Sequence, residues 1–160
     1  KNYQRMHDTI LWATKSNNYI FNRQYEPFSE KTVIAQYKRK VEGGRAVQDK
    51  TQEMQRTHEG VSKHDVWDIA FIHPVANERL GYPTQKPEEL VKSIIIGSSK
   101  ENDIVADFFC GSGTTAAVAE KLNRKWICGD IGELAIETTA KRLEKIQGTK
   151  NFCFYEKVQI

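Results

Sequence analysis

A glycine-rich turn carries the residues of this sequence that are best suited to chemistry. Gly111, Gly113 and Ala116 match the Gly-x-Gly-x-x-Gly/Ala fingerprint, in which missing side chains let a ligand approach the backbone. Asp130 follows 17 residues after Gly113, and an acidic residue there can accept hydrogen bonds from both ribose hydroxyls of an adenosine. The pattern therefore predicts a nucleoside cofactor, and the alternative is a tight turn that binds no ligand.

The charge beside the turn distinguishes between nucleoside cofactors. Asp107 precedes the glycines, where the pyrophosphate of a dinucleotide would lie, and a carboxylate there would repel a diphosphate. The same carboxylate would attract S-adenosylmethionine, which carries a sulfonium and an ammonium group. No Gly-Lys-Ser/Thr follows the turn, so it is not a Walker loop. The charges favour S-adenosylmethionine, and the alternative role for Asp107 is an ordinary cap at the end of a strand.

The segments around the turn alternate as in an α/β domain. A helix is expected to begin at Pro87, to carry an apolar face over residues 90–95 and to end at Gly97. The segments that follow are expected to be a buried strand, a helix, a strand, a helix and a strand, over residues 104–109, 114–122, 125–130, 133–146 and 151–158. This order predicts a parallel sheet with the cofactor at the carboxyl ends of its strands.

The sequence before residue 60 is less regular. The apolar run 10–13, within residues 7–16, suits a short buried strand, and Ser29 can cap a helix that reaches Val41. Between Lys31 and His58, seven lysines and arginines are opposed by only three acids. Such a stretch can neutralise the phosphates of a nucleic acid. The alternative is a solvated helix face.

Composition and cysteine spacing exclude several classes of protein. Hydrophobic residues make up 39% and charged residues 28% of the 160 residues, as in a folded globular chain, and the net charge is only +3. No apolar run approaches the roughly 18 residues of a membrane span. The four histidines and three cysteines match no metal-ligand spacing and no disulfide framework. We expect a cytoplasmic chain without a membrane segment or a metal site.

Two motifs in order resemble a known family. Thr84-Gln85-Lys86-Pro87, a helix, and then residues 107–115 resemble elements of the β-class DNA N6-adenine and N4-cytosine methyltransferases. Those elements read Thr-x-Lys-Pro and Asp-Pro-Phe-x-Gly-Ser-Gly-Thr-Thr, so Phe108 stands here where the family has proline. The likeness continues through residues 124–130 and 135–143. Residues 7–21 resemble the last sheet strands of the family's catalytic half.

The resemblance implies a fold and a division of the chain. The fold would be a partial Rossmann-like sheet of an S-adenosylmethionine-dependent methyltransferase, with a basic helical or loop insertion. Residues 1–22 would end the sheet of the catalytic half, residues 23–63 would form the target-recognition segment, and residues 64–160 would bind the cofactor. The partner would be double-stranded DNA, contacted by four basic residues of the insertion: Lys38, Arg39, Lys40 and Arg45.

The resemblance also implies a role for individual residues at the cofactor. Thr84 and Lys86 would reach the carboxylate of S-adenosylmethionine, and Asp130 would hold the ribose. Beside Asp107, the methionine end would be lined by Phe109, Gly111, Ser112, Gly113 and Thr114.

The family's catalytic motif does not occur in this sequence. That motif is Asp/Asn/Ser-Pro-Pro followed by an aromatic residue, which also stacks on a flipped base. No two of the four prolines are adjacent: Pro27, Pro74, Pro83 and Pro87. We therefore expect a truncated chain that is inactive alone and that self-associates or needs an amino-terminal catalytic half. Two alternatives stay open, a fragment of an NAD-dependent oxidoreductase and a non-catalytic DNA-binding remnant.

Overall fold

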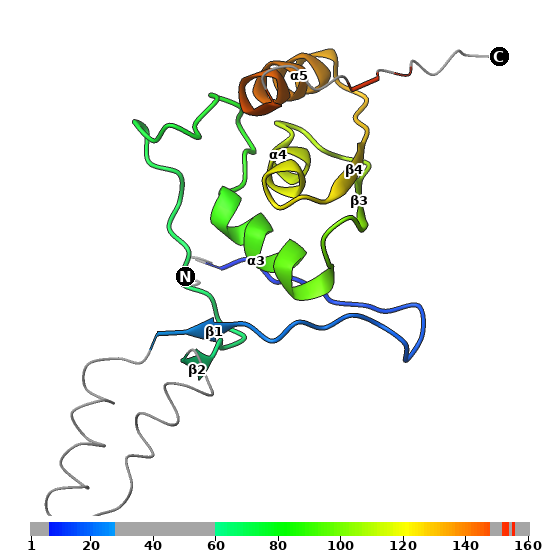
Figure 1. Cartoon of the computed structure of the whole chain (residues 1–160). Helices are drawn as coiled ribbons and strands as arrows, with labels where there is room; N and C mark the ends of the chain where they lie inside the picture. Colours follow the sequence, from blue (N-terminus) through cyan, green and yellow to red (C-terminus); the bar gives the residue numbers. More distant parts are fainter. Residues whose placement is uncertain (1–6, 28–59, 148–151, 154, 156–160) are drawn as a thin grey trace, which may run out of the picture.

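The computed structural model describes residues 7–27, 60–147, 152, 153 and 155. Its elements, in chain order, are β1 (Tyr25–Glu26), β2 (Val61–Ser62), α3 (Glu88–Ser98), β3 (Ile104–Asp107), α4 (Thr114–Lys121), β4 (Lys125–Cys128) and α5 (Glu133–Gln147). The helices pack with β3 and β4 into one unit, while β1 and β2 lie together beyond α3 (Figure 1). In the part of the chain described, no helix is long and apolar enough to cross a membrane.

A parallel strand–helix–strand unit forms the centre of the fold. β3 and β4 pair in parallel, with Ile104 opposite Lys125 and Asp107 opposite Cys128. Between them α4 packs against both strands. This unit confirms the predicted α/β fold and brings the carboxyl ends of both strands to the glycine turn. The helix predicted from Pro87 also forms, but it ends at Ser98 rather than at Gly97.

Small side chains let α4 lie between α3, α5 and the sheet. Ala116, Ala117 and Ala119 are completely buried, because a methyl side chain allows neighbouring elements to approach closely. One cluster of the core joins Ile95 of α3 to α4 and the strands, and it contains Val118, Ala119, Val105 and Trp126. The alanine-rich sequence after the turn therefore forms the buried middle of the unit.

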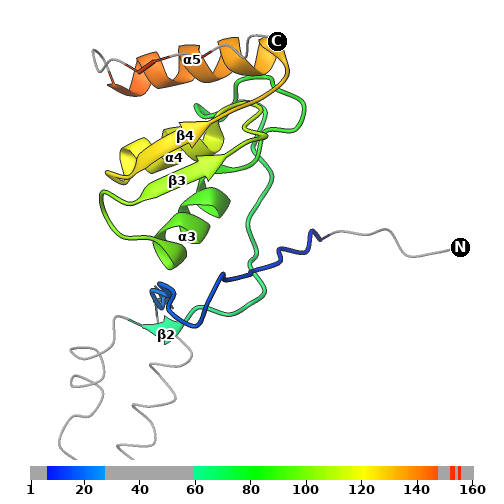
Figure 2. The ribbon, with the colours of Figure 1, turned by 90° about the vertical axis from the view of Figure 1, so that its right-hand side faces the viewer.

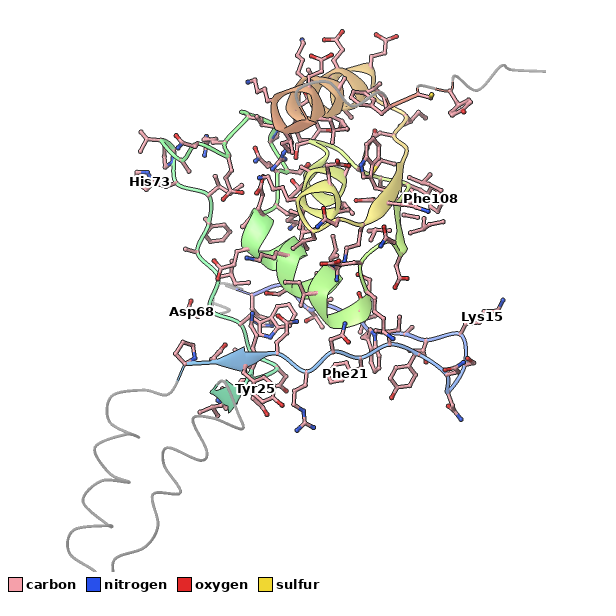
Figure 3. The ribbon with its side chains drawn as sticks, in the orientation of Figure 1. Lys15, Phe21, Tyr25, Asp68, His73 and Phe108 are labelled. Carbon is pink, nitrogen blue, oxygen red and sulfur yellow. The ribbon has the colours of Figure 1, made fainter. Side chains whose placement is uncertain are left out.

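The other face of β3 and β4 is uncovered by the described residues. Ile104 and Ile127 are 64% and 53% exposed, and Figure 2 shows both strands in front of α4 with no described helix over them. The prediction that residues 104–109 form a buried strand is therefore wrong in its burial. Because α3 and α4 cover only one face, Val105 points inward and Ile104 outward. Phe108, labelled in Figure 3, is exposed as well.

Residues 7–16 form no strand, so the strand predicted there is wrong, and residues 17–21 are not in a strand either. The assignment of residues 1–22 to the sheet of a catalytic half stays a prediction. Trp12 instead packs against Tyr19 and Phe21 of the same segment, at ring-centroid distances of 5.0 and 5.7 Å. A strand needs a neighbouring strand for its backbone groups, and none of the described strands pairs with this segment.

The amino-terminal segment is fastened to the end of α3. The side-chain amide of Asn22 donates to the carbonyls of Ile96 at 2.8 Å and Ser99 at 2.9 Å, and its backbone N–H donates to Gly97 at 2.8 Å. From the other side, Arg124 donates to the carbonyl of Ser99 at 3.0 Å. These donors satisfy carbonyls that the last turn of a helix leaves without intrahelical partners.

A short ladder brings the two ends of segment 28–59 together. β1 and β2 pair antiparallel, with Tyr25 opposite Ser62 (Figure 1). The helix predicted after Ser29 and the four predicted DNA contacts (Lys38, Arg39, Lys40 and Arg45) lie outside the described residues. Of the strand predicted at 151–158, three residues are described, and none of them is in a strand.

Candidate cofactor-binding site

Two left-handed backbone conformations turn the chain from β3 into α4. Gly111 has a φ of 51° and Gly113 a φ of 70°, a region that favours glycine. Gly113 is the N-cap of α4, and the N–H of Ala117 donates to its carbonyl at 3.0 Å. A Cβ at Gly113 would lie 2.6 Å from the Oγ1 of Thr139, so α5 packs directly against the turn. The turn requires glycine here for its conformation and for this contact.

Asp130 reaches back from the end of β4 to the turn. Its carboxylate accepts hydrogen bonds from the N–H of Gly111 at 2.8 Å and of Gly132 at 2.9 Å. The hydrogen bonds from Gly132 and Gly111 hold the pKa of Asp130 below its usual value. The carboxylate is therefore ionised at neutral pH, and its remaining lone pairs can accept further hydrogen bonds, as ribose hydroxyls would require.

Asp107 lies on the other side of the turn, at the end of β3. It accepts hydrogen bonds from the N–H of Phe109 at 3.0 Å and from the hydroxyl of Thr115 at 2.6 Å. These contacts make it a cap of the strand end, which was the alternative that the sequence left open. Its charge nevertheless lies beside the glycines, as the argument for a cationic cofactor requires.

The segment Thr84–Pro87 lies next to the turn, so the structure brings the two sequence motifs together. The hydroxyl of Thr114 donates to the carbonyl of Lys86 at 3.3 Å. The side chains of Thr84 and Lys86 are exposed. The ammonium of Lys86 forms a surface ion pair with Asp8 at 3.2 Å.

Hydrogen bonds within the loop before α3 hold this segment in shape. The side chain of Gln85 accepts from the N–H of Leu80 at 2.9 Å and donates to the carbonyl of Glu78 at 2.5 Å. The carboxylate of Glu78 accepts from the N–H of Glu88 at 2.9 Å, which caps the start of α3. Sequence reasoning identified the Thr-Gln-Lys-Pro motif but not these roles of Gln85 and Glu78.

A buried arginine below the turn was also missed by sequence reasoning. The side chain of Arg142, on α5, is 5% exposed, and its Nη1 donates to the carbonyl of Ser112 at 3.1 Å and to the hydroxyl of Thr114 at 3.0 Å. Its Nη2 donates to Glu88 at 2.8 Å, and Glu88 also pairs with Lys121 at 2.5 Å. Burial raises the pKa of Glu88, but the hydrogen bonds from Lys121 and Arg142 together hold it below its usual value.

The residues predicted to line the methionine end differ widely in exposure. Ser112 and Thr114 are buried, and their side-chain oxygens lie 3.2 Å apart in a hydrogen bond. Phe109 is 91% exposed. The turn therefore presents the ring of Phe109 to solvent, while Ser112 and Gly113 are buried and the hydroxyl of Thr114 is engaged inside the protein.

Cys110 and Cys128 form a pair of thiols beside the turn. They are hydrogen-bonded to each other, and the sulfur of Cys110 also lies 3.9 Å from the Oγ1 of Thr139. The hydrogen bond from Cys128, opposed by burial, lowers the pKa of Cys110 to about 7, while the same contact and burial raise the pKa of Cys128. Within the described ranges, no three side chains of metal-binding type gather to hold an ion.

Comparison with known proteins decides the family. A family model named N6_N4_Mtase and described as DNA methylase matches residues 1–141. The chain belongs to the N6/N4 DNA methylase family. S-adenosylmethionine is the cofactor of this family, in agreement with the prediction from the charges at the turn. The recognised resemblance is thereby confirmed, and an origin in the NAD-dependent oxidoreductases has no support.

Curated members of the N6/N4 DNA methylase family resemble most of the chain. Type II methyltransferase M.HpaI of Haemophilus parainfluenzae is 34% identical over 145 residues, which cover 90% of this chain and 40% of that protein. DNA adenine methyltransferase YhdJ of Escherichia coli K12 is 36% identical over 147 residues, which cover 90% and 47%. The chain thus spans less than half the length of these two relatives.

Solved methylase structures match a smaller part of the chain. The M1.HpyAVI–SAM complex is 37% identical, with a TM-score of 0.43, and the match covers 46% of this chain and 36% of that one. The cytosine-N4-specific PvuII DNA methyltransferase is 32% identical, with a TM-score of 0.38, and the match covers 42% and 26%.

Proposed function

We propose that this chain is the cofactor-binding part of a DNA methyltransferase that transfers a methyl group from S-adenosylmethionine to an exocyclic amine, adenine N6 or cytosine N4. The observation that carries the proposal is the glycine turn between Asp107 and Asp130, with the Thr84–Pro87 segment bonded to it through Thr114. Membership of the DNA methylase family supports the same reaction.

The residues at the turn fit S-adenosylmethionine in charge and shape. Gly111, which is half-buried, has no side chain to block a ligand, while the buried Gly113 shapes the turn. Asp107 and Asp130 set two negative charges beside a cofactor that carries a sulfonium and an ammonium group. Asp130, at the end of β4, would accept the ribose hydroxyls. Unlike a dinucleotide, S-adenosylmethionine brings no negatively charged diphosphate next to these two carboxylates.

Lys86 would bind the carboxylate of the cofactor, with Thr84 beside it. In the structure the ammonium of Lys86 faces Asp8 instead, and the two side chains are 59% and 85% exposed. An ion pair that exposed is worth about 0–1 kcal/mol, so exchanging Asp8 for the cofactor carboxylate costs little.

The part of this chain in the reaction would be to hold the methyl donor in line with the target. When bound, S-adenosylmethionine supplies a methyl group on a positively charged sulfur. The turn and Asp130 would fix the donor, and such alignment accounts for much of the acceleration in transfer between two bound groups. The acceptors for the target amine belong to the Pro-Pro motif, which this sequence lacks, so the chain is proposed to be inactive alone.

A partner for the chain is part of the proposal. Ile104 and Ile127 expose apolar surface on the open face of β3 and β4, which suits contact with an amino-terminal catalytic half or with a second copy. Double-stranded DNA would be contacted by the basic part of segment 23–63. A cytoplasmic location stays a prediction.

Calorimetric titration of the chain with S-adenosylhomocysteine and, separately, with NAD tests the cofactor. We expect saturable binding of S-adenosylhomocysteine only, weakened roughly tenfold to 100-fold by Asp130→Ala, because hydrogen bonds to a charged acceptor are worth about 1.5–3 kcal/mol. Asp103→Ala is the matched control. Asp103 also accepts a backbone hydrogen bond, from Lys100 at 2.8 Å, but at the amino end of β3.

Each other outcome points to a different account. Binding of NAD in place of S-adenosylhomocysteine would overturn the proposal. Binding of neither nucleoside would favour the non-catalytic DNA-binding remnant. Equal weakening by Asp103→Ala and Asp130→Ala would show a general loss of stability and remove the argument for a ribose contact at Asp130.

A further inference from the structure

The guanidinium of Arg142 is a buried cation with several specific acceptors. Removing a charge from water is costly unless the charge is paired and hydrogen-bonded, and Arg142 meets that requirement through Glu88 and through the oxygens of Ser112 and Thr114. An apolar side chain at this place would avoid the cost of burial. A buried arginine here therefore points to a role that depends on the positions of its acceptors.

Three segments converge on this one guanidinium. Ser112 belongs to the glycine turn, Thr114 is the first residue of α4, and Glu88 is the first residue of α3. The hydroxyl of Thr114 links Arg142 to the Lys86 segment, because it also donates to the carbonyl of Lys86, two residues before Glu88. Arg142 thus fixes the spacing between the glycine turn and the Lys86 segment.

We propose that Arg142 is a positioning residue for the methionine end of S-adenosylmethionine. The inference rests on the proposed function, in which the turn and Lys86 hold that end of the cofactor. Arg142 contacts neither cofactor nor substrate. It holds the turn and the Lys86 backbone at a fixed separation, so that both reach the amino-acid part of the cofactor at once.

The adenosine end is held without Arg142. Asp130, the proposed ribose ligand, is oriented by the N–H groups of Gly111 and Gly132. In the described part of the chain, the hydrogen bonds of Arg142 go to Ser112, Thr114 and Glu88 and to none of these three residues. Loss of Arg142 should therefore weaken recognition of the methionine end more than recognition of the nucleoside. A residue with only a structural role would affect both ends alike.

Two ligands separate these effects. S-Adenosylhomocysteine carries the amino-acid part, and 5′-methylthioadenosine has the same nucleoside and sulfur without the ammonium and carboxylate. We expect Arg142→Met to weaken S-adenosylhomocysteine at least tenfold while 5′-methylthioadenosine changes about twofold or less. Calorimetric titration measures both affinities, and thermal unfolding reports the stability of each variant.

A conservative variant and a matched control complete the set. Arg142→Lys keeps the charge, but a single ammonium lacks the planar fork that reaches the turn and Glu88 together. We therefore expect this variant to weaken S-adenosylhomocysteine relative to 5′-methylthioadenosine by about threefold or more, which is less than in Arg142→Met. This variant also serves if Arg142→Met does not fold. The control is Lys141→Met on the same helix, whose charge pairs only with exposed Glu137 at 3.3 Å among the described contacts. It should leave both affinities unchanged.

The outcomes divide clearly. Equal weakening of both ligands in the Arg142 variants, or affinities in Arg142→Lys equal to those of the unmodified chain, would overturn the inference and leave the proposed function intact. If the unmodified chain binds neither ligand, the proposed function fails, and the inference fails with it. A selective loss of S-adenosylhomocysteine in the Arg142 variants alone supports both.

Discussion

Substituting Gly113 by alanine tests whether the turn is shaped by its contact with α5. The backbone of Gly113 has a φ of 70°, and an added Cβ would lie 2.6 Å from Oγ1, 2.7 Å from Cγ2 and 2.9 Å from Cβ of Thr139. Thr139 is buried. Carbon atoms at such distances overlap, so α5 or the turn has to move. Gly81 gives a matched control, because its φ is 77° and an added Cβ there meets nothing within 4 Å.

The expected loss of stability on substituting Gly113 is the sum of two separate costs. A left-handed conformation costs an alanine roughly 1–2 kcal/mol, and this cost applies at both positions. Forcing an extra methyl into a packed site costs about 1–3 kcal/mol more, and this applies only at Gly113. Gly113→Ala should therefore lower the free energy of unfolding by about 2–5 kcal/mol and Gly81→Ala by about 1–2 kcal/mol. The larger loss is a substantial part of the roughly 5–15 kcal/mol that stabilise a typical domain.

Urea unfolding at neutral pH, followed by circular dichroism, measures this difference. Thr139→Ala in the Gly113→Ala background removes two of the three overlapping atoms, so it should recover part of the loss despite the missing hydrogen bond to Gly111 at 3.2 Å. If Gly113→Ala costs no more than Gly81→Ala, the packing of α5 on the turn is not tight, and the reasoning fails.

Two further predictions concern acid stability and DNA. The pKa of Glu88 is lowered in the fold, so its ionised form stabilises the protein above the pKa of this group in the unfolded chain, and this contribution is lost as pH falls through the folded pKa. Between pH 7 and 3, the urea midpoint should fall less steeply for Glu88→Gln than for the unmodified chain. Parallel curves for the two proteins would refute a stabilising role of ionised Glu88. If the four basic residues Lys38, Arg39, Lys40 and Arg45 contact phosphates, replacing all of them by glutamine should flatten the plot of log affinity against log salt by up to about 0.9 per lost contact. Lys141→Gln with Lys145→Gln is the control for lost charge, and an equal change in slope there would locate the binding elsewhere.

The elements after residue 87 follow from local signals. Pro87 and the acids after it predict the start of α3, and the glycines between an apolar strand and an alanine-rich helix predict the turn. These signals depend on neighbours in the sequence, so the bounds of the elements between residues 87 and 147 agree with the structure to within a few residues. Asp130 could be placed at the turn for the same reason, because its position at the end of the next strand fixes where it lies.

Features that depend on distant partners could not be predicted. The apolar run 10–13 looks like a strand, but a strand requires an edge to pair with, which the sequence of the run cannot supply. The apolar run within 104–109 likewise does not tell which face is covered. Arg142 had a weak signal, since it lies at helical spacing from buried Ala135 and Thr139. That spacing marks it as facing inward, but its acceptors come from three other segments.

The ladder between β1 and β2 bears on how proteins of this kind can change over time. Because Tyr25 pairs with Ser62 and Glu26 with Val61, the described residues on the two sides of segment 28–59 meet at one point. The entropy of closing a flexible loop rises only with the logarithm of its length, about 0.6 kcal/mol for each doubling. An insertion joined in this way can be lengthened, shortened or exchanged for another with little cost to the rest of the chain. On the proposed division of the chain, in which residues 23–63 recognise the target, a change of target sequence would then leave the proposed cofactor-binding part unaltered.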